Sequence, residues 1–213
     1  VFTLHASEMD YEMKAFAERG ETPTSYLKKI GALNPRLLAA HCIHLSDADI
    51  ELMKESGAAV AHCIGSNTKA AKGVAPIAAL AKAGVRYGLG TDGPSSGNTL
   101  SMFDQMRLFA VCHKTANHDR GIFPARDIVR AATRGGAEAL GAGEEFGQIR
   151  PGMRADMVLV SVDAPHMFPV YNPYSALVYG ANSSDVRYVM AGGKMRVRDG
   201  VLTQLDMEEA KAR

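Results

Sequence analysis

The stretch Val85–Gly93, which reads VRYGLGTDG, decides the fold. It starts as an apolar run that favours an extended chain, and the acid Asp92 follows at the point where a β-strand would end. Two earlier apolar runs end in the same way, one in His5 and one in His41, and Glu8 lies three residues beyond the first. Imidazole and carboxylate groups placed repeatedly at the carboxyl ends of strands are typical of a catalytic metal site on a β/α barrel.

Strand-like and helix-like segments alternate through the first two-thirds of the chain. The apolar runs predict strands over Val1–Ala6, Leu37–Cys42, Ala58–His62 and Val85–Thr91. Helical periodicity, N-caps and glycine stops predict helices over Ser7–Arg19, from Ser46 to Gly57, over Ala75–Ala83, near Leu100–His113, and over Ala125–Thr133 and Gly136–Leu140. We expect a loop between the third strand and the third helix, because Gly, Ser and Asn occur there. Four βα units in succession predict a parallel sheet wrapped by helices.

These units make only half of a (β/α)8 TIM barrel, which needs eight units and about 250 residues. The chain begins without a methionine, directly in a strand. We therefore expect an α/β fold in which residues 1–146 are the C-terminal half of such a barrel, and the missing N-terminal half belongs to the same polypeptide. If that half is absent, another chain must cover the unpaired side of the sheet. A homo-oligomer is therefore an alternative.

The alternation of predicted strands and helices ends at Gly147. Residues 147–213 are expected to form a β-rich module. A strand is predicted over Asp156–Val162. Val186–Ala191 and Lys194–Arg198 are predicted to form a β-hairpin, because two glycines separate them. A short charged helix is expected at Met207–Arg213.

Composition excludes several classes of protein. The formal net charge of +1 argues against nucleic acid as a partner, because a domain that binds phosphates usually carries a basic excess. The longest apolar stretches have the length of a strand or are broken by Gly and Lys, so no segment of about 20 residues could span a membrane. The N-terminus has neither the basic flank nor the apolar core of a signal peptide. The three cysteines show no CxxC spacing, which is typical of reduced thiols in a cytoplasmic protein.

Four ordered motifs carry a resemblance to a known family: Leu4–Glu8 (LHASE), Ala40–Leu45 (AHCIHL), His62–Asn67 (HCIGSN) and Gly90–Gly93 (GTDG). They resemble the amidohydrolase superfamily, specifically its branch of methylthioadenosine/S-adenosylhomocysteine deaminases and triazine hydrolases. The segment GQIRPGMRAD, residues 147–156, is similar to the strand that returns to the family's β-sandwich domain, so residues 147–213 are expected to be part of that small domain. Ile64 stands where many members carry Pro, and the family's His-x-His metal pair does not occur in this chain.

The resemblance implies one catalytic divalent metal, usually zinc, with iron as the alternative. Its ligands would be the absent His-x-His pair, His5 and Asp92. Asp92 would also orient the attacking water and accept its proton. Glu8 and His41 would contact the substrate: Glu8 would carry a proton to a ring nitrogen, and His41 would hydrogen-bond the attacking oxygen.

Several of these residues have a purely structural alternative. Asp92 could be an N-cap or turn residue, and Glu8 could be an acid in the first turn of a helix. His62 could contact the substrate, but a structural role is expected for it, and the role of His44 stays open. Ser66 and Asn67 are expected to organise their loop by capping bonds. Surface or loop positions are expected for His113, His118 and His166, and core positions for Met102, Phe103, Met106 and Phe109.

The predicted function is hydrolytic deamination of an amino-substituted aromatic heterocycle, a small molecule of the adenosine type. The alternatives within the family are a triazine chlorohydrolase or aminohydrolase and a guanine-type deaminase. A non-catalytic half-barrel is the alternative of another class. The other zinc deaminases of nucleobases, which carry Pro-Cys-x-x-Cys, are excluded because the chain has no such cysteine pair. Neither a G-x-G-x-x-G fingerprint after a strand nor a P-loop occurs, so a nucleotide-binding Rossmann domain is poorly supported.

Overall fold

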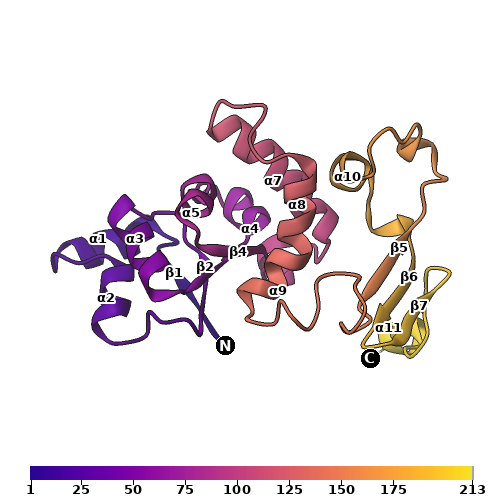
Figure 1. The fold of residues 1–213 in the computed structure, drawn as a ribbon, viewed down its shortest axis with the longest axis horizontal. Helices are drawn as coiled ribbons and strands as arrows, with labels where there is room; N and C mark the ends of the chain where they lie inside the picture. Colours follow the sequence, from indigo (N-terminus) through magenta and orange to yellow (C-terminus); the bar gives the residue numbers. More distant parts are fainter. Residues whose placement is uncertain (213) are drawn as a thin grey trace.

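The computed structural model describes residues 1–212 and contains two sheets (Figure 1). The first is parallel, with the order β1-β2-β3-β4. Its strands are β1 (Phe2–Ala6), β2 (Leu37–His41), β3 (Ala59–His62) and β4 (Arg86–Leu89). Ala6 pairs with His41 and His62 with Leu89, so all four carboxyl ends lie at one edge of this sheet. The predicted parallel sheet and its strands are confirmed to within two residues at each end.

Helices connect the strands and continue beyond β4. They are α1 (Asp10–Ala17), α2 (Pro23–Lys29), α3 (Asp47–Ser56), α4 (Ile64–Lys69), α5 (Ile77–Ala83), α6 (Pro94–Gly97), α7 (Met102–Ala116), α8 (Ala125–Arg130), the π-helical turn η1 (Ala131–Gly135) and α9 (Gly136–Ala139). The helix α3 begins as predicted, because the Ser46 side chain accepts a hydrogen bond from the amide of Asp49. The alternation of strand and helix is therefore the α/β arrangement expected from the sequence.

Two helical segments differ from the prediction. The helix expected over Ser7–Arg19 begins only at Asp10, because the Glu12 carboxylate accepts hydrogen bonds from the amides of Ser7 and Glu8 and so caps the helix. The loop expected after β3 contains the helix α4, whose residues Ile64–Asn67 are buried. The Gly65 amide in α4 donates to the Gln105 side chain of α7 over 3.0 Å. Because this contact is with another element, the local sequence pattern does not predict it.

The core lies between the parallel sheet and its helices. Val60, Ile64, Leu80, Phe109 and Ile128 are each 0% exposed. The core position expected for Phe109 is confirmed, as it is for Met106, and Phe103 is partly buried against the same cluster. The long helix α7 therefore packs against the sheet with an apolar face, as its sequence predicts.

His113 lies in this core, and the prediction of a surface or loop position for it is wrong. The imidazoles of His62 and His113 are buried, and their Nε2 atoms lie 3.0 Å apart. Phe109 contacts both rings, and Phe123 contacts His113. Burial lowers the pKa of His113 to about 4, and burial together with the charges of His113 and His41 holds the pKa of His62 well below its usual range. The pair is therefore a neutral part of the core.

We expect this pair to make the protein less stable as the pH falls from about 6.5 to about 4. His113 takes up a proton near pH 6.5 when unfolded but only near pH 4 when folded, so the unfolded state binds more protons between these values. Between pH 7.5 and pH 5, His113 alone should lower the free energy of unfolding by about 2 kcal/mol. Urea midpoints of the full-length protein at the two pH values measure the loss. His113→Gln should show a smaller pH dependence, whereas the exposed control His118→Gln should behave as the wild type; equal midpoints at both pH values for the wild type would contradict the prediction.

The second sheet is antiparallel and holds the strands β5 (Met157–Val160), β6 (Val186–Ala191), β7 (Lys194–Arg198) and β8 (Val201–Leu202). The predicted hairpin is confirmed, since β6 and β7 pair across Gly192 and Gly193, whose positive φ angles of 57° and 76° suit a tight hairpin turn. The helix α11 (Met207–Ala212) ends the described chain. Figure 1 shows this sheet to one side of the parallel one.

The connection between β5 and β6 returns to the helices around the parallel sheet. It contains the short helical segments η2 (Pro165–Met167), α10 (Pro173–Ser175), η3 (Ala176–Gly180) and η4 (Ser183–Asp185). Arg107 of α7 donates a hydrogen bond to the carbonyl oxygen of Ala181 over 2.8 Å, and Val178 is 0% exposed. Among the described helices, none is long and apolar enough to cross a membrane.

Candidate metal centre

Three predicted site residues meet at the carboxyl edge of the parallel sheet. His5 lies near the end of β1, Glu8 follows it, and His41 ends β2. One ligand atom from each of the three lies within 4.8 Å of the other two. The Glu8 carboxylate lies 3.5 Å from His41 Nε2 and 3.9 Å from His5 Nδ1. Two imidazoles and a carboxylate are a donor set that zinc prefers.

His41 has a hydrogen-bond partner at Nδ1, on the side of the ring away from Glu8. The sequence did not assign this partner to the site. His41 Nδ1 lies 2.8 Å from Asn67 Oδ1, and both side chains are buried. With this oxygen as the acceptor, His41 donates from Nδ1 and presents Nε2 to Glu8. The sequence predicted that Asn67 caps a loop; instead it lies in α4 and orients His41. Such a hydrogen bond behind a ligand histidine fixes the tautomer and the ring orientation.

Glu8 precedes the helix α1 rather than lying in its first turn. The acids of that turn are Asp10 and Glu12, so the alternative of a helix-stabilising acid does not hold for Glu8. Its carboxylate points into the site and pairs with Lys72, whose Nζ lies 2.5 Å from Oε1. Lys72 follows α4, and no sequence motif predicted that it would lie at the site.

Asp92 follows β4, two strands along the sheet from β2. Its φ angle of 57° is left-handed, and its Oδ1 accepts a hydrogen bond from the Gly93 amide over 2.7 Å. Burial opposes its negative charge, but hydrogen bonds from Ser66, Gly93 and Ser96 and the attraction of His41 hold the pKa of Asp92 below its usual value. Asp92 is thus an ionised carboxylate at the same edge of the sheet as His5 and His41. Its convergence with them on one metal stays a prediction.

The remaining histidines of the described chain lie outside this cluster. His44 contacts Asp10 over 3.4 Å near the surface, and His166 contacts Asp185 over 2.9 Å in the connection between β5 and β6. His118 is exposed, as predicted.

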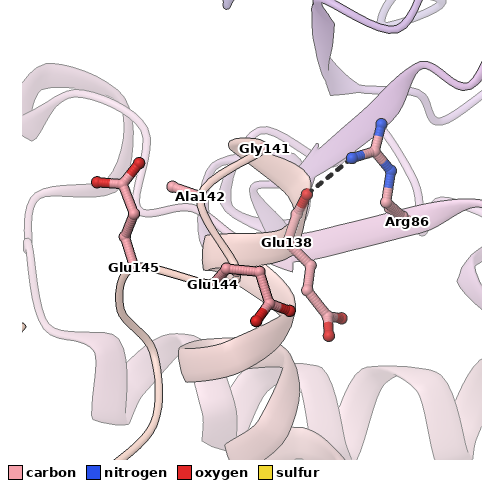
Figure 2. A pocket seen from close by; sticks show the side chains of 7 residues that line it. Arg86, Glu138, Gly141, Ala142, Glu144 and Glu145 are labelled. Atoms are coloured by element: carbon pink, nitrogen blue, oxygen red, sulfur yellow. Dashed lines mark hydrogen bonds between the residues drawn. The ribbon is translucent and has the colours of Figure 1, made fainter. Parts of the chain in front are cut away.

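A surface pocket of about 300 Å³ lies elsewhere on the molecule (Figure 2). It is lined by Arg86 at the start of β4 and by Glu138 and residues 141–145. The Arg86 guanidinium donates to the carbonyl oxygens of Glu138 and Gly57 over 2.9 and 2.6 Å. Because Arg86 begins β4 whereas Asp92 follows its end, this pocket is not associated with the candidate metal centre.

The profile of the amidohydrolase family matches residues 1–196. The chain belongs to this family. The matched range contains the whole parallel sheet, with His5 in β1, His41 at the end of β2 and Asp92 after β4. The sequence-based assignment of the family is therefore confirmed.

Curated relatives include two deaminases. The 5-methylthioadenosine/S-adenosylhomocysteine deaminase of Syntrophobacter fumaroxidans is 42% identical over 211 residues, which cover 99% of this chain and 48% of that protein. The 5'-deoxyadenosine deaminase of Methanosarcina mazei is 40% identical over 207 residues, which cover 97% of this chain and 48% of that protein. The chain thus spans about half the length of the curated relatives that it matches.

Two solved structures also match nearly the whole chain and about half of their own length. An adenosine deaminase from Xanthomonas campestris with bound zinc matches with a TM-score of 0.94 at 37% identity, over 99% of this chain and 48% of that one. An atrazine chlorohydrolase from Arthrobacter aurescens complexed with zinc matches with a TM-score of 0.89 at 29% identity, over 99% of this chain and 47% of that one.

Proposed function

We propose that this chain is the second half of a metal-dependent deaminase that acts on an adenosine-type purine of the methylthioadenosine or S-adenosylhomocysteine class. The observation that carries the proposal is the meeting of His5, Glu8 and His41 at the carboxyl edge of a parallel sheet, within 4.8 Å. Relatives named as deaminases of such nucleosides, at about 40% identity, support the choice of substrate.

The metal would be held by His5 and Asp92 together with ligands from the other half. Zinc is the ion that suits these nitrogen and oxygen donors, with iron as the alternative, and it would supply a Lewis acid that lowers the pKa of water to about 7. The donors of this chain fit such an ion, since ligand atoms of His5, Glu8 and His41 lie within 4.8 Å of one another at the carboxyl edge of the sheet.

The chain's residues would divide the proton transfers of the reaction. Asp92 accepts a proton from the attacking water, as a carboxylate that is ionised at neutral pH can do. Glu8 carries a proton to the ring nitrogen next to the attacked carbon, and His41 forms a hydrogen bond to the oxygen added at that carbon. Asp92 then gives its proton to the amino group, the carbon–nitrogen bond breaks as ammonia leaves, and the hydroxyl proton of the added oxygen returns to Glu8, which leaves the oxo form of the ring.

Residues 1–146 would form the second half of a (β/α)8 barrel, and residues 147–213 part of a small β-sandwich domain. The open edges of the parallel sheet support the first assignment, since β1 and β4 each pair with one strand only. The His5 side chain is 69% exposed, which is unusual for a metal ligand and fits a site that is completed by other residues. We propose that these residues come from an N-terminal half of the same polypeptide. The three free cysteines favour a cytoplasmic protein.

A chlorohydrolase or aminohydrolase of triazines is the second candidate, because the atrazine chlorohydrolase fold matches over 99% of this chain. Its leaving group distinguishes it, since a chlorotriazine would release chloride and an adenosine-type purine would release ammonia.

The full-length protein that contains this chain should release ammonia from 5'-methylthioadenosine, S-adenosylhomocysteine or 5'-deoxyadenosine. The assay follows ammonia enzymatically and the loss of adenine absorbance, with guanine and a chlorotriazine as competing substrates. Chelation of the metal should abolish the activity, and zinc or iron should restore it. Release of chloride alone, deamination of guanine alone, or no turnover by the metal-loaded protein would overturn the proposal.

A further inference from the structure

The Glu8 carboxylate contacts three basic side chains of the described chain, and one of them lies much closer than the other two. His41 and His5 lie 3.5 and 3.9 Å away, whereas Lys72 Nζ lies 2.5 Å from Oε1. A charge-assisted hydrogen bond of this kind is shorter and stronger than a neutral one. The Lys72 and Glu8 side chains are 19% and 15% exposed, so solvent screens this pair less than a surface pair. Lys72 is therefore the group that holds the Glu8 carboxylate.

The position of Lys72 is built into the chain that follows α4. Ala71 before it has a φ angle of 53° and Gly73 after it has one of 122°. A Cβ on Gly73 would lie 3.0 Å from the Ile43 side chain, so this turn depends on glycine. The Lys72 amide also donates to the carbonyl oxygen of Asn67 over 2.9 Å. Because Asn67 binds His41, the same short segment fixes both His41 and the lysine that binds Glu8.

The two oxygens of the Glu8 carboxylate have different neighbours. Oε1 faces Lys72 Nζ and His41 Nε2, whereas Oε2 lies 3.9 Å from His5 Nδ1. A proton shuttle needs one oxygen with a free lone pair that faces the reacting atoms. Lys72 occupies Oε1 and leaves Oε2 on the side of His5, where the metal would be held.

We propose that Lys72 is a positioning residue that fixes the Glu8 carboxylate through Oε1 and so presents Oε2 for proton transfer to the substrate. The assignment rests on the proposed function, because it gives Glu8 the role of the proton shuttle. Lys72 itself takes no part in the transfer and contacts neither the substrate nor the metal.

The test compares Lys72→Met with Lys72→Arg in the full-length enzyme. Methionine keeps the apolar part of the side chain but removes the cation, so kcat should fall by about 10- to 100-fold through loss of carboxylate orientation. KM should stay within about threefold and the metal content should equal that of the wild type, because neither substrate nor metal touches Lys72. Arginine retains a donor and should restore most of kcat. Lys82→Met, which changes an exposed lysine on α5, is the matched control and should leave kcat unchanged.

An unchanged kcat in Lys72→Met would overturn the proposal, as would a rise in KM alone, which indicates a substrate contact, or a loss of metal. If Lys72→Met fails to fold, Lys72→Gln and Lys72→Arg give the same comparison, and an arginine variant as slow as the glutamine variant would count against the proposal. A crystal structure of the Lys72 variant gives a readout without turnover: the Glu8 carboxylate should leave its place beside His41. If the wild type releases no ammonia, the proposed function fails, and the position of Glu8 in that structure still decides the role of Lys72.

Discussion

Glu8→Gln in the full-length enzyme is expected to lower kcat by about a hundredfold or more while the bound metal stays. Glutamine keeps the size of the side chain and can still form hydrogen bonds, but it cannot take up and release a proton. In the structure the carboxylate lies between the two histidines and is held by Lys72, so a neutral amide would occupy the same place. Steady-state kinetics on 5'-methylthioadenosine, together with metal analysis of the purified variant, measures the effect.

The control for this experiment is Glu18→Gln, which changes an exposed acid at the end of α1 and should leave kcat unchanged. Because Glu8 belongs to the cluster within 4.8 Å, a ligand role has to be separated from a shuttle role. Loss of metal together with activity would make Glu8 a ligand, and full activity of Glu8→Gln would remove it from the mechanism altogether.

A polypeptide of residues 1–213 alone is expected to have no measurable deaminase activity and to associate with itself. Its parallel sheet ends in two unpaired edge strands, and on the β1 side Val1 and Phe2 are 62% and 37% exposed. The metal would also lack the ligands that we assign to the other half. Sedimentation, zinc content and ammonia release, measured beside the full-length protein, test the expectation.

Addition of the N-terminal half as a separate chain provides a positive arm for the same experiment. Recovery of zinc binding and activity on mixing would support the half-barrel assignment. A zinc-loaded, active monomer of residues 1–213 would refute it.

The sequence was most informative where local chemistry decides the structure. The strands that lead to His5, His41 and Asp92 were predictable because β-favouring apolar runs stop at polar residues, and the hairpin because two glycines supply the positive φ angles of its turn. The same patterns carried the family motifs. They were sufficient for the α/β fold and for the three residues His5, Glu8 and His41 that meet at one edge of its sheet.

Contacts between distant segments were not predictable in this way. Lys72 lies 64 residues from Glu8 in sequence, and His113 lies 51 residues from His62. Nothing near Lys72 or His113 distinguishes them from an ordinary surface lysine and an ordinary helical histidine. The helix α4 was missed for the same reason, since its buried residues are stabilised by α7 rather than by an apolar period of their own.

The left-handed backbone at the strand ends limits how far this site can be moved to another protein. His41, Cys42 and Asp92 have φ angles of 70°, 50° and 57°, a region that costs an L-residue about 1–2 kcal/mol and excludes β-branched side chains. The packing around these strand ends must supply that energy. A designer who copied only the side chains onto the regular strand ends of another protein would aim the imidazole and the carboxylate in the wrong directions. The strand end together with its turn is therefore the unit that would have to be copied, because the backbone turn sets the direction in which each of these side chains points.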